Sequence, residues 1–575
     1  MDRIRESLGA VRALTAALAM LMVASILLGG STHSGYLSDV ILEALAAPVL
    51  LVVLWFWAGE PMERLPLPEM AFCAAMFALP LAQLIDLPPN FWLKLPHGEL
   101  RQSAQLSAQV GLAWGPLSLV PSETWLCVVA IVPPIAIFLG TAYLPAFERR
   151  IVVAALLSAG LVSAGLGLLQ VAQGPGSLLR PFALTNPSEA VGFFANRNHL
   201  AALLYTVLLL ATAWAAHGLT SEQADKGHSA IGNRTIIASV AGFTVIVILL
   251  SAEAMARSRA GIGLTMFALV GCFVVAWTGN PKTQAKDDEG FFTGARLIMG
   301  AASLAGLLVV QFALYRIMDR FADDPLKDAR IQFSRNTFAA ALDAMPWGSG
   351  LGSFVKVYPI GLSPRDQLLD TFANHAHNDV VEFWLEAGLP GLVLMIVFVS
   401  WFAWQCVALW KRTAPQMYAL DLKLARSASL AALLLIAHSL VDYPLRTEAM
   451  MAVFALACGL MTDVTPVAAA IKPHDFASAR TAKQYAAAGS AAANRKPSPA
   501  FLQLELTPKG KPQVFAPTNL SMPPRKQADL WQPDQPWPDA WTPSNLAQPG
   551  QWDTDPQPAP DDPGSSAEDD QNKTN

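Results

Sequence analysis

The segment His375-Ala-His-Asn-Asp-Val-Val-Glu-Phe-Trp-Leu-Glu386 holds the densest group of side chains able to do chemistry. Asn378, Glu382 and Glu386 recur every four residues, so a helix would place them on one face. His377 would lie at the start of that helix, where an imidazole can accept a proton from a hydroxyl. The spacing therefore predicts acid–base chemistry at a helix N-terminus.

Four further polar clusters stand where apolar runs begin. They are Pro121-Ser-Glu-Thr-Trp125, Asn196-Arg-Asn-His199, Ser258-Arg-Ala-Gly261 and Asp442-Tyr-Pro-Leu-Arg446. A helix N-terminus presents free N–H groups and a partial positive charge, and both favour an anion. Arginines in or beside these clusters add donors for several oxygens; they are Arg197, Arg257, Arg259 and Arg446. Together the clusters predict a site for an anion such as a diphosphate.

Composition indicates that these clusters are positioned by membrane helices. Of the 575 residues, 53% are apolar and only 14% are charged, whereas a soluble domain is about 25% charged. The formal net charge of −5 provides no basic surface for a nucleic acid. These values exclude a disordered chain, a nucleic-acid binder and an ordinary soluble enzyme.

About twelve apolar runs approach the roughly 20 residues that a membrane helix needs. They lie near residues 11–30, 38–58, 68–86, 123–143, 150–171, 198–217, 234–252, 260–278, 294–315, 380–410, 425–442 and 446–462. The sequence thus predicts an all-α polytopic membrane domain over residues 1–462. The two least regular of these apolar runs are 68–86, which contains Pro80 and Gln83, and 425–442.

The distribution of Lys and Arg predicts the orientation of this domain. With the N-terminus in the cytoplasm, the cytoplasmic connections hold 15 basic residues and the short connections on the other side hold seven. This asymmetry places both termini inside, because cytoplasmic loops carry the excess of Lys and Arg. The long segment 316–380 is left out of the comparison, since long loops translocate regardless of charge. We expect it to be a large, ordered periplasmic segment.

Residues 463–575 differ in composition from the rest of the chain. They hold 18 of the 42 prolines and no long apolar run. We predict a disordered, Pro-rich cytoplasmic tail. It is either a solvated appendage without a partner or a docking segment for a cytoplasmic component, such as part of a polysaccharide export assembly.

The order of the motifs resembles that of the O-antigen ligase and polymerase superfamily, in which a His-Asn pair precedes an acidic helix and a Gly-Leu-Pro-Gly turn. Here that segment is His377–Gly391. Five other segments agree in order: Pro116–Trp125, Phe194–Leu200, Ser258–Gly261, Gly348–Phe354 after Arg330, and His438–Arg446. The resemblance covers roughly residues 10–462. Each motif is degenerate alone, but six in sequence are fairly specific.

The resemblance implies a C-type glycosyltransferase-like fold in the bacterial inner membrane, working without a metal, another cofactor or a nucleotide sugar. The implied donor is a glycan on undecaprenyl diphosphate at the periplasmic face. An acceptor hydroxyl would attack the anomeric carbon with inversion. Three acceptors stay open: lipid A–core for a ligase of lipopolysaccharide, a lipid-linked glycan for an O-antigen or exopolysaccharide polymerase, and a protein.

Carried over residue by residue, the resemblance implies three catalytic groups, Arg259, Arg330 and His377. The residues expected to bind substrate are Arg197, His199, Asn378, Arg257, Glu382 and Arg446. Arg335 lies about one helical turn from Arg330 and is an alternative for the same role.

Two alternatives to this interpretation stay open. His375, His377 and Asp379 are possible metal ligands, although a spacing of two at a helix start points the side chains apart. A transporter or a flippase of lipid-linked glycan also suits twelve helices. A transporter, however, places its polar residues near the membrane midplane and often has internal repeats, whereas these clusters gather at one face and no repeat is evident.

Overall fold

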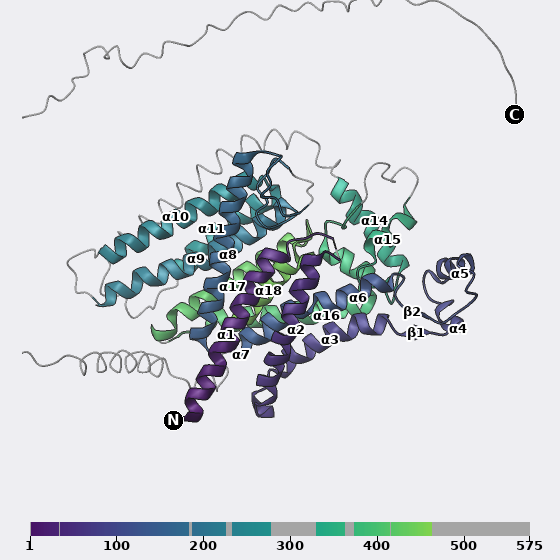
Figure 1. Cartoon of the computed structure of the whole chain (residues 1–575), viewed down its shortest axis with the longest axis horizontal. Helices are drawn as coiled ribbons and strands as arrows, with labels where there is room; N and C mark the ends of the chain where they lie inside the picture. The colour runs from purple at the N-terminus through teal and green to yellow at the C-terminus, as the bar shows by residue number, and fades with distance from the viewer. Residues whose placement is uncertain are drawn as a thin grey trace, which may run out of the picture. The chain divides into compact units, whose positions relative to one another are not determined.

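The computed structural model describes residues 2–33, 35–182, 187–225, 233–277, 329–362, 373–414 and 416–462. This part of the chain is almost entirely helical (Figure 1). The predicted run 294–315 and the predicted tail 463–575 lie outside the described residues, as does part of the segment 316–380. The other eleven predicted runs all coincide with helices.

The first half of the membrane domain contains α1 (Asp2–Leu28), α2 (Leu37–Ala58), α3 (Leu67–Gln83), α6 (Pro121–Ala130), α7 (Val132–Tyr143) and α8 (Ala146–Gln173). The expected single run 123–143 is divided at Ile131, because Pro133 and Pro134 lack the N–H groups that a continuous helix needs. Between α3 and α6 lies a small unit outside the apolar helices. It contains β1 (Asp86–Leu87), α4 (Pro89–Trp92), α5 (Gly98–Ser107) and β2 (Gly115–Pro116), with β1 antiparallel to β2.

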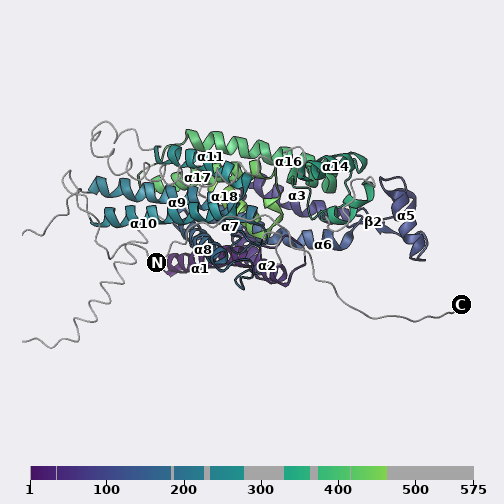
Figure 2. The same cartoon turned by 90° about the horizontal axis from the view of Figure 1, so that it is seen from above.

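The second half contains α9 (Arg197–Asp225), α10 (Asn233–Ala256), α11 (Arg259–Trp277), α14 (Ala329–Asp343), α15 (Phe354–Val357), α16 (Asp379–Lys411), α17 (Ala419–His438) and α18 (Glu448–Met461). The helices α9 and α10 lie side by side, and α11 packs against α9 (Figures 1 and 2). Short α14 and α15 belong to the segment predicted to be a large external loop.

Seven helices of the described part are long and apolar enough to cross a membrane. They are Leu8–Leu28, Leu37–Ala58, Pro121–Tyr143, Ala146–Gln173, Arg197–Gly218, Arg259–Trp277 and Asp379–Lys411. Three shorter apolar helices are Leu67–Gln83, Val240–Ala256 and Glu448–Met461. The prediction of an all-α chain with several membrane helices is confirmed. The total of twelve stays a prediction.

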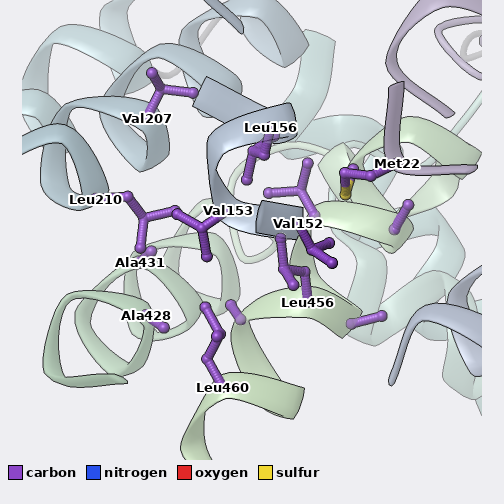
Figure 3. Close-up of a cluster of buried hydrophobic side chains, with 14 of the residues drawn as sticks. Met22, Val152, Val153, Leu156, Val207, Leu210, Ala428, Ala431, Leu456 and Leu460 are labelled. Atoms are coloured by element: carbon purple, nitrogen blue, oxygen red, sulfur yellow. The ribbon is translucent and has the colours of Figure 1, made fainter. Parts of the chain in front are cut away.

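Side chains from most of the apolar helices form a continuous core, and the residues labelled in Figure 3 come from five of these helices. It includes Met22 of α1, Val152, Val153 and Leu156 of α8, Val207 and Leu210 of α9, Ala428 and Ala431 of α17, and Leu456 and Leu460 of α18. Lipid tails are as apolar as these side chains, so close packing rather than removal from water holds membrane helices together. The alanines of α17 suit this packing because they let helices approach closely.

The helix α16 is kinked at Gly388, where φ is +60°. At this kink the loop before α15 crosses the helix: the N–H of Leu389 donates to the carbonyl of Pro346 at 2.7 Å, and the N–H of Gly350 donates to the carbonyl of Glu386 at 3.0 Å. A Cβ on Gly388 would lie 2.4 Å from the Pro346 oxygen. Only glycine therefore fits both the φ value and the close approach.

Candidate active site

Polar side chains from several helix ends meet around the loop that joins α17 to α18. The amide of Asn196, just before α9, donates to the hydroxyl of Tyr443 at 3.1 Å. The amide of Asn198 donates to the carboxylate of Asp442. The imidazole of His377, just before α16, also reaches Asp442. Three of the five predicted polar clusters are thus joined directly.

The pair of His377 and Asp442 forms the centre of this site. Nδ1 of His377 lies 2.9 Å from Oδ1 of Asp442. The His377 side chain is 19% exposed and the Asp442 side chain is fully buried. A carboxylate on Nδ1 fixes the tautomer and the orientation of an imidazole. Nε2 of His377 is then the ring atom through which a proton can be accepted from a substrate.

The Asp442 carboxylate is held in its charged form. Burial alone would raise its pKa, but the hydrogen bond from His377 and the positive charge of Arg330 lower the pKa well below its usual range. Nη1 of Arg330 lies 3.8 Å from Oδ2 of Asp442. Arg330, the second residue of α14, therefore approaches the same carboxylate as His377.

The backbone at His377 has an unusual conformation. Its φ is +53°, and that of Arg257 is +52°; a non-glycine residue rarely adopts this left-handed region. Such strain persists where the surroundings impose it, often at functional sites. The ring of Phe333 stacks on His377 with centroids 6.1 Å apart, and Tyr443 meets its edge at 4.9 Å. These rings fix the imidazole between α14 and the α17–α18 loop.

Tyr443 contacts three histidines. Its ring centroid lies 4.2 Å from that of His375, 4.9 Å from that of His377 and 5.0 Å from that of His199. His199 is fully buried, and neither of its ring nitrogens has a hydrogen-bond partner among the described residues. The predicted substrate-binding residue His199 thus lies behind Tyr443, away from solvent.

A second group of charges surrounds Arg446. Its Nη1 lies 2.6 Å from Oε2 of Glu386 and 3.6 Å from Oε1 of Glu382, and its Nε lies 3.5 Å from Oδ1 of Asp379. Burial alone would lower the pKa of this guanidinium, but the carboxylates of Glu382 and Glu386 raise it. Arg446 therefore joins the α17–α18 loop to the acidic face of α16. We call these four residues, with His375, the Arg446 network.

His375 connects this network to the His377 loop. Its Nδ1 lies 2.8 Å from Oε1 of Glu382, whose other oxygen accepts from the N–H of Ala376 at 2.7 Å. Burial lowers the pKa of His375, but the Glu382 carboxylate outweighs burial, and the net pKa is raised. The predicted substrate ligand Glu382 is thus engaged with the protein's own backbone and imidazole.

Two other predicted substrate ligands have internal partners. Asn378 is the N-cap of α16: its side-chain oxygen accepts from the N–H groups of Val380 and Val381. Arg197, the first residue of α9, lies 3.0 Å from Oε1 of Glu189, and its side chain is 18% exposed. Arg197 thus keeps part of its surface open toward the loop end of the bundle.

The remaining predicted arginines lie at the ends of α11 and along α14. Arg259 is the first residue of α11 and is exposed, and Arg257 is half-buried. Arg335 is exposed, whereas the Arg330 side chain is 35% exposed and faces Asp442. Between the two candidates on α14, the structure brings Arg330 to His377.

The fifth predicted cluster, Pro121–Trp125, joins the network by another route. The hydroxyl of Thr124 donates to the carbonyl of Leu351 at 2.7 Å. Three residues on, the N–H of Phe354 donates to Oε1 of Glu386 at 3.1 Å. This cluster therefore supports the glycine-containing loop over α16 rather than the His377–Asp442 pair.

The three residues that contact the His377 imidazole were not assigned a role from the sequence: Asp442, Tyr443 and Phe333. The first two belong to the polar cluster 442–446, so their position at a helix start was a usable signal. Phe333 is one aromatic among 27 phenylalanines, and nothing in its spacing indicates that it stacks on His377.

The three alternative metal ligands are directed to different partners. His375 reaches Glu382, and His377 reaches Asp442. Oδ2 of Asp379 accepts from the Ser439 hydroxyl at 2.7 Å. Within the described ranges, no group of three His, Cys, Asp or Glu residues has the arrangement of a metal site. The side chains of His375, His377 and Asp379 instead take part in hydrogen bonds and ion pairs within the protein.

Comparison with known proteins adds one finding. Residues 230–396 match a family model described as O-antigen ligase. The matched range includes Ser258–Gly261, Arg330 and His377. No curated protein matches the chain. The match confirms the resemblance that the motifs indicated.

Proposed function

We propose that the chain, of which residues 230–396 match an O-antigen ligase family model, is an inverting, metal-independent glycosyltransferase of the inner membrane. Its donor is a glycan on undecaprenyl diphosphate, and its acceptor is a hydroxyl of lipid A–core or of a growing polysaccharide. Glycan transfer of the ligase or polymerase type follows from the family. We propose three further points: the identity of the donor, the inversion of the anomeric centre, and the side of the membrane on which the active site lies.

The single observation that carries the mechanism is the 2.9 Å contact between His377 and Asp442. The acceptor oxygen attacks the anomeric carbon, a new C–O bond forms, and the bond from that carbon to the diphosphate oxygen breaks. Nε2 of His377 takes the proton of the acceptor hydroxyl. Asp442 stabilises the imidazolium that results and holds the ring in place. A single displacement of this kind inverts the anomeric centre.

Arginines serve the leaving diphosphate, whose negative charge grows as the glycosidic bond breaks. We assign this role first to Arg330 and Arg259, with Arg257 and Arg197 beside them. Arg330 contacts Asp442 at 3.8 Å with a side chain that is one-third exposed, so it can reach both the pair and a ligand. Arg446, Asn378 and Glu382 instead hold the site together, since Arg446 pairs with Glu386, Asn378 caps α16 and Glu382 contacts His375.

We further propose that the site faces the periplasm and that the N-terminus and the chain after α18 face the cytoplasm. The polar helix ends lie together at one end of the bundle, around the α17–α18 loop. Arg149 and Arg150 near the start of α8, and Lys411 and Arg412 at the end of α16, lie at the opposite ends of their helices from that site. The excess of basic residues at that end is typical of the cytoplasmic side.

The test compares His377→Ala and Asp442→Asn with the native protein in a deletion strain, by gels of lipopolysaccharide and secreted polysaccharide. Loss of all glycan from lipid A–core, with accumulation of lipid-linked polymer, identifies a ligase. Core capped by a single repeat, or loss of high-mass polysaccharide, identifies a polymerase. His217→Ala, at the other end of α9, is the matched control. Unchanged profiles for both site variants at normal protein levels would refute the mechanism and favour a transporter.

A further inference from the structure

Two buried cations lie at the end of the bundle away from the candidate active site. Lys423 and Arg426, both on α17, are only 5% and 9% exposed. Fifteen residues separate Lys423 from His438, which corresponds to about 22 Å along a helix. These cations therefore belong to neither the His377–Asp442 pair nor the Arg446 network.

Neither cation is neutralised by a carboxylate among the described residues. Nζ of Lys423 and Nε of Arg426 are buried and have no hydrogen-bond partner there. Arg426, three residues after Lys423 on the same helix, is another cation. The nearest acid in sequence, Asp421, is engaged by both Nε and Nη2 of Arg150 at 2.7 Å. Two buried positive charges thus lie on one turn of α17, and neither forms an ion pair with a carboxylate of the described residues.

Arg149, at the same end of the bundle, shows how the fold treats a buried cation that is purely structural. It is 5% exposed, yet its guanidinium donates to four carbonyls, those of Ala142, Leu144, Gly459 and Thr462, at 2.8–3.3 Å. An unpaired buried charge is costly. The contrast indicates that Lys423 and Arg426 are arranged for an anion that comes from outside the chain.

The neighbouring groups suit a phosphate. Ser427, one turn after Lys423, is fully buried and its hydroxyl has no partner in the described part. Its hydroxyl is a neutral hydrogen-bond donor beside the ammonium of Lys423 and the unpartnered Nε of Arg426. Arg426 is kept in place by the carbonyl of Arg412 at 2.8 Å and by the ring of Trp410 at 5.3 Å. One turn of α17 therefore offers three kinds of donor for phosphate oxygens.

The surroundings suit a lipid as the source of that phosphate. Trp404 and Val407 of α16 are 62% and 54% exposed, and Met417, just before α17, is 50% exposed. These apolar side chains lie near the end of a membrane-spanning helix, where acyl chains meet headgroups. Basic pockets between membrane helices bind the headgroups of anionic lipids.

We propose that Lys423, Arg426 and Ser427 form a binding site for the phosphate of an anionic phospholipid, on the leaflet opposite to the candidate active site. The lipid supplies the missing counter-charge and fastens α17 to the end of α16. Because α17 leads directly to Asp442, an occupied site steadies the helix on which the catalytic pair depends. The site stands independently of the glycosyl transfer proposed above.

The test uses the full-length protein in detergent, titrated with phosphatidylglycerol, phosphatidylcholine or inorganic phosphate. Thermal unfolding and native mass spectrometry are the readouts. We expect phosphatidylglycerol alone to raise the Tm and to remain bound. Lys423→Met weakens this binding by about tenfold or more, since it removes a charge-assisted contact. Lys411→Gln, an exposed cation at the same end, is the matched control and retains the response.

Each outcome decides the proposal. The proposal is supported if Lys423→Met no longer responds to phosphatidylglycerol and, in the absence of lipid, is at least as stable as the native protein. That result means that Lys423 has no counter-charge until the lipid binds. A Tm increase from inorganic phosphate equal to that from phosphatidylglycerol overturns a lipid source. A response to phosphatidylglycerol in Lys423→Met equal to that of the native protein overturns the site. Loss of lipid retention in Arg426→Gln gives a second, independent reading if Lys423→Met fails to fold.

Discussion

Asp442 binds Nδ1 of His377 at 2.9 Å, although the two residues are 65 positions apart in sequence. The contact joins the start of α16 to the loop between α17 and α18. It gives the imidazole a fixed orientation, with Nε2 directed away from the carboxylate.

Asp442→Asn keeps the shape of the side chain but removes the charge that stabilises an imidazolium. We expect the rate of glycan transfer to fall on the order of 10²–10⁴-fold, the usual contribution of general base catalysis. The protein level should be unaffected. The double variant with His377→Ala should be little slower than His377→Ala alone, because the two residues act as one unit. Single-turnover rates with a purified lipid-linked donor would measure this, and additive losses would contradict it.

Arg446→Gln leaves the carboxylates of the Arg446 network without their cation. Removing one partner of a buried ion pair costs about 3–5 kcal/mol, so we expect a large loss in the free energy of unfolding. Arg446→Lys keeps the charge and should cost less. Adding Glu386→Gln to Arg446→Gln should recover part of the loss. Denaturant unfolding in detergent would test this; normal stability with weaker donor binding would instead make Arg446 a substrate ligand.

The raised pKa of His375 predicts a pH dependence of stability. The folded protein holds this proton more tightly than the unfolded chain does. The stabilisation is therefore fully present below about pH 6.5, the ordinary histidine value, and is lost as pH rises through the higher pKa of the folded state. His375→Gln should remove this loss. Tm profiles of the two proteins that remain parallel above pH 6.5 would contradict the assignment.

Gly388→Ala places a Cβ 2.4 Å from the oxygen of Pro346, at a φ of +60°. We expect a cost of about 1–3 kcal/mol from the backbone conformation alone, with a further cost from displacement of the loop. Gly165→Ala is the matched control, since a Cβ there meets nothing within 4 Å and alanine favours a helix. Thermal unfolding of both variants would test this; similar Tm values would show that the loop moves freely.

The apolar runs were sufficient to predict eleven helices, because about 20 apolar residues have few other ways to be stable in a bilayer. They were not sufficient to explain Gln83, which made the run 68–86 look irregular. Its side chain is buried and bridges two backbones, with Nε2 on the carbonyl of Glu386 and Oε1 on the N–H of Leu351, both at 2.9 Å. Such a contact spans more than 260 residues, and sequence periodicity contains no information about it.

The candidate site was predictable as a set of polar clusters but not as a set of partners. Helix-start motifs indicated that His377 and Arg446 belong near one another, and the family resemblance added Arg330 to them. Which carboxylate each one engages depends on the packing of α14, α16 and α17, so the division into a His377–Asp442 pair and an Arg446 network required the structure. Asn378 illustrates the difference: a motif residue expected to meet substrate is the N-cap of α16.

The position of Asp442 after α17 has a consequence for biogenesis. A chain entering the membrane from its N-terminus completes α1 to α16, with every predicted arginine except Arg446, before this carboxylate has been synthesised. Until then the imidazole of His377 has neither its orienting partner nor the ring of Tyr443. A nascent chain that has not yet extended past Tyr443 therefore lacks both partners of His377, and the pair is completed only when the membrane domain is nearly finished.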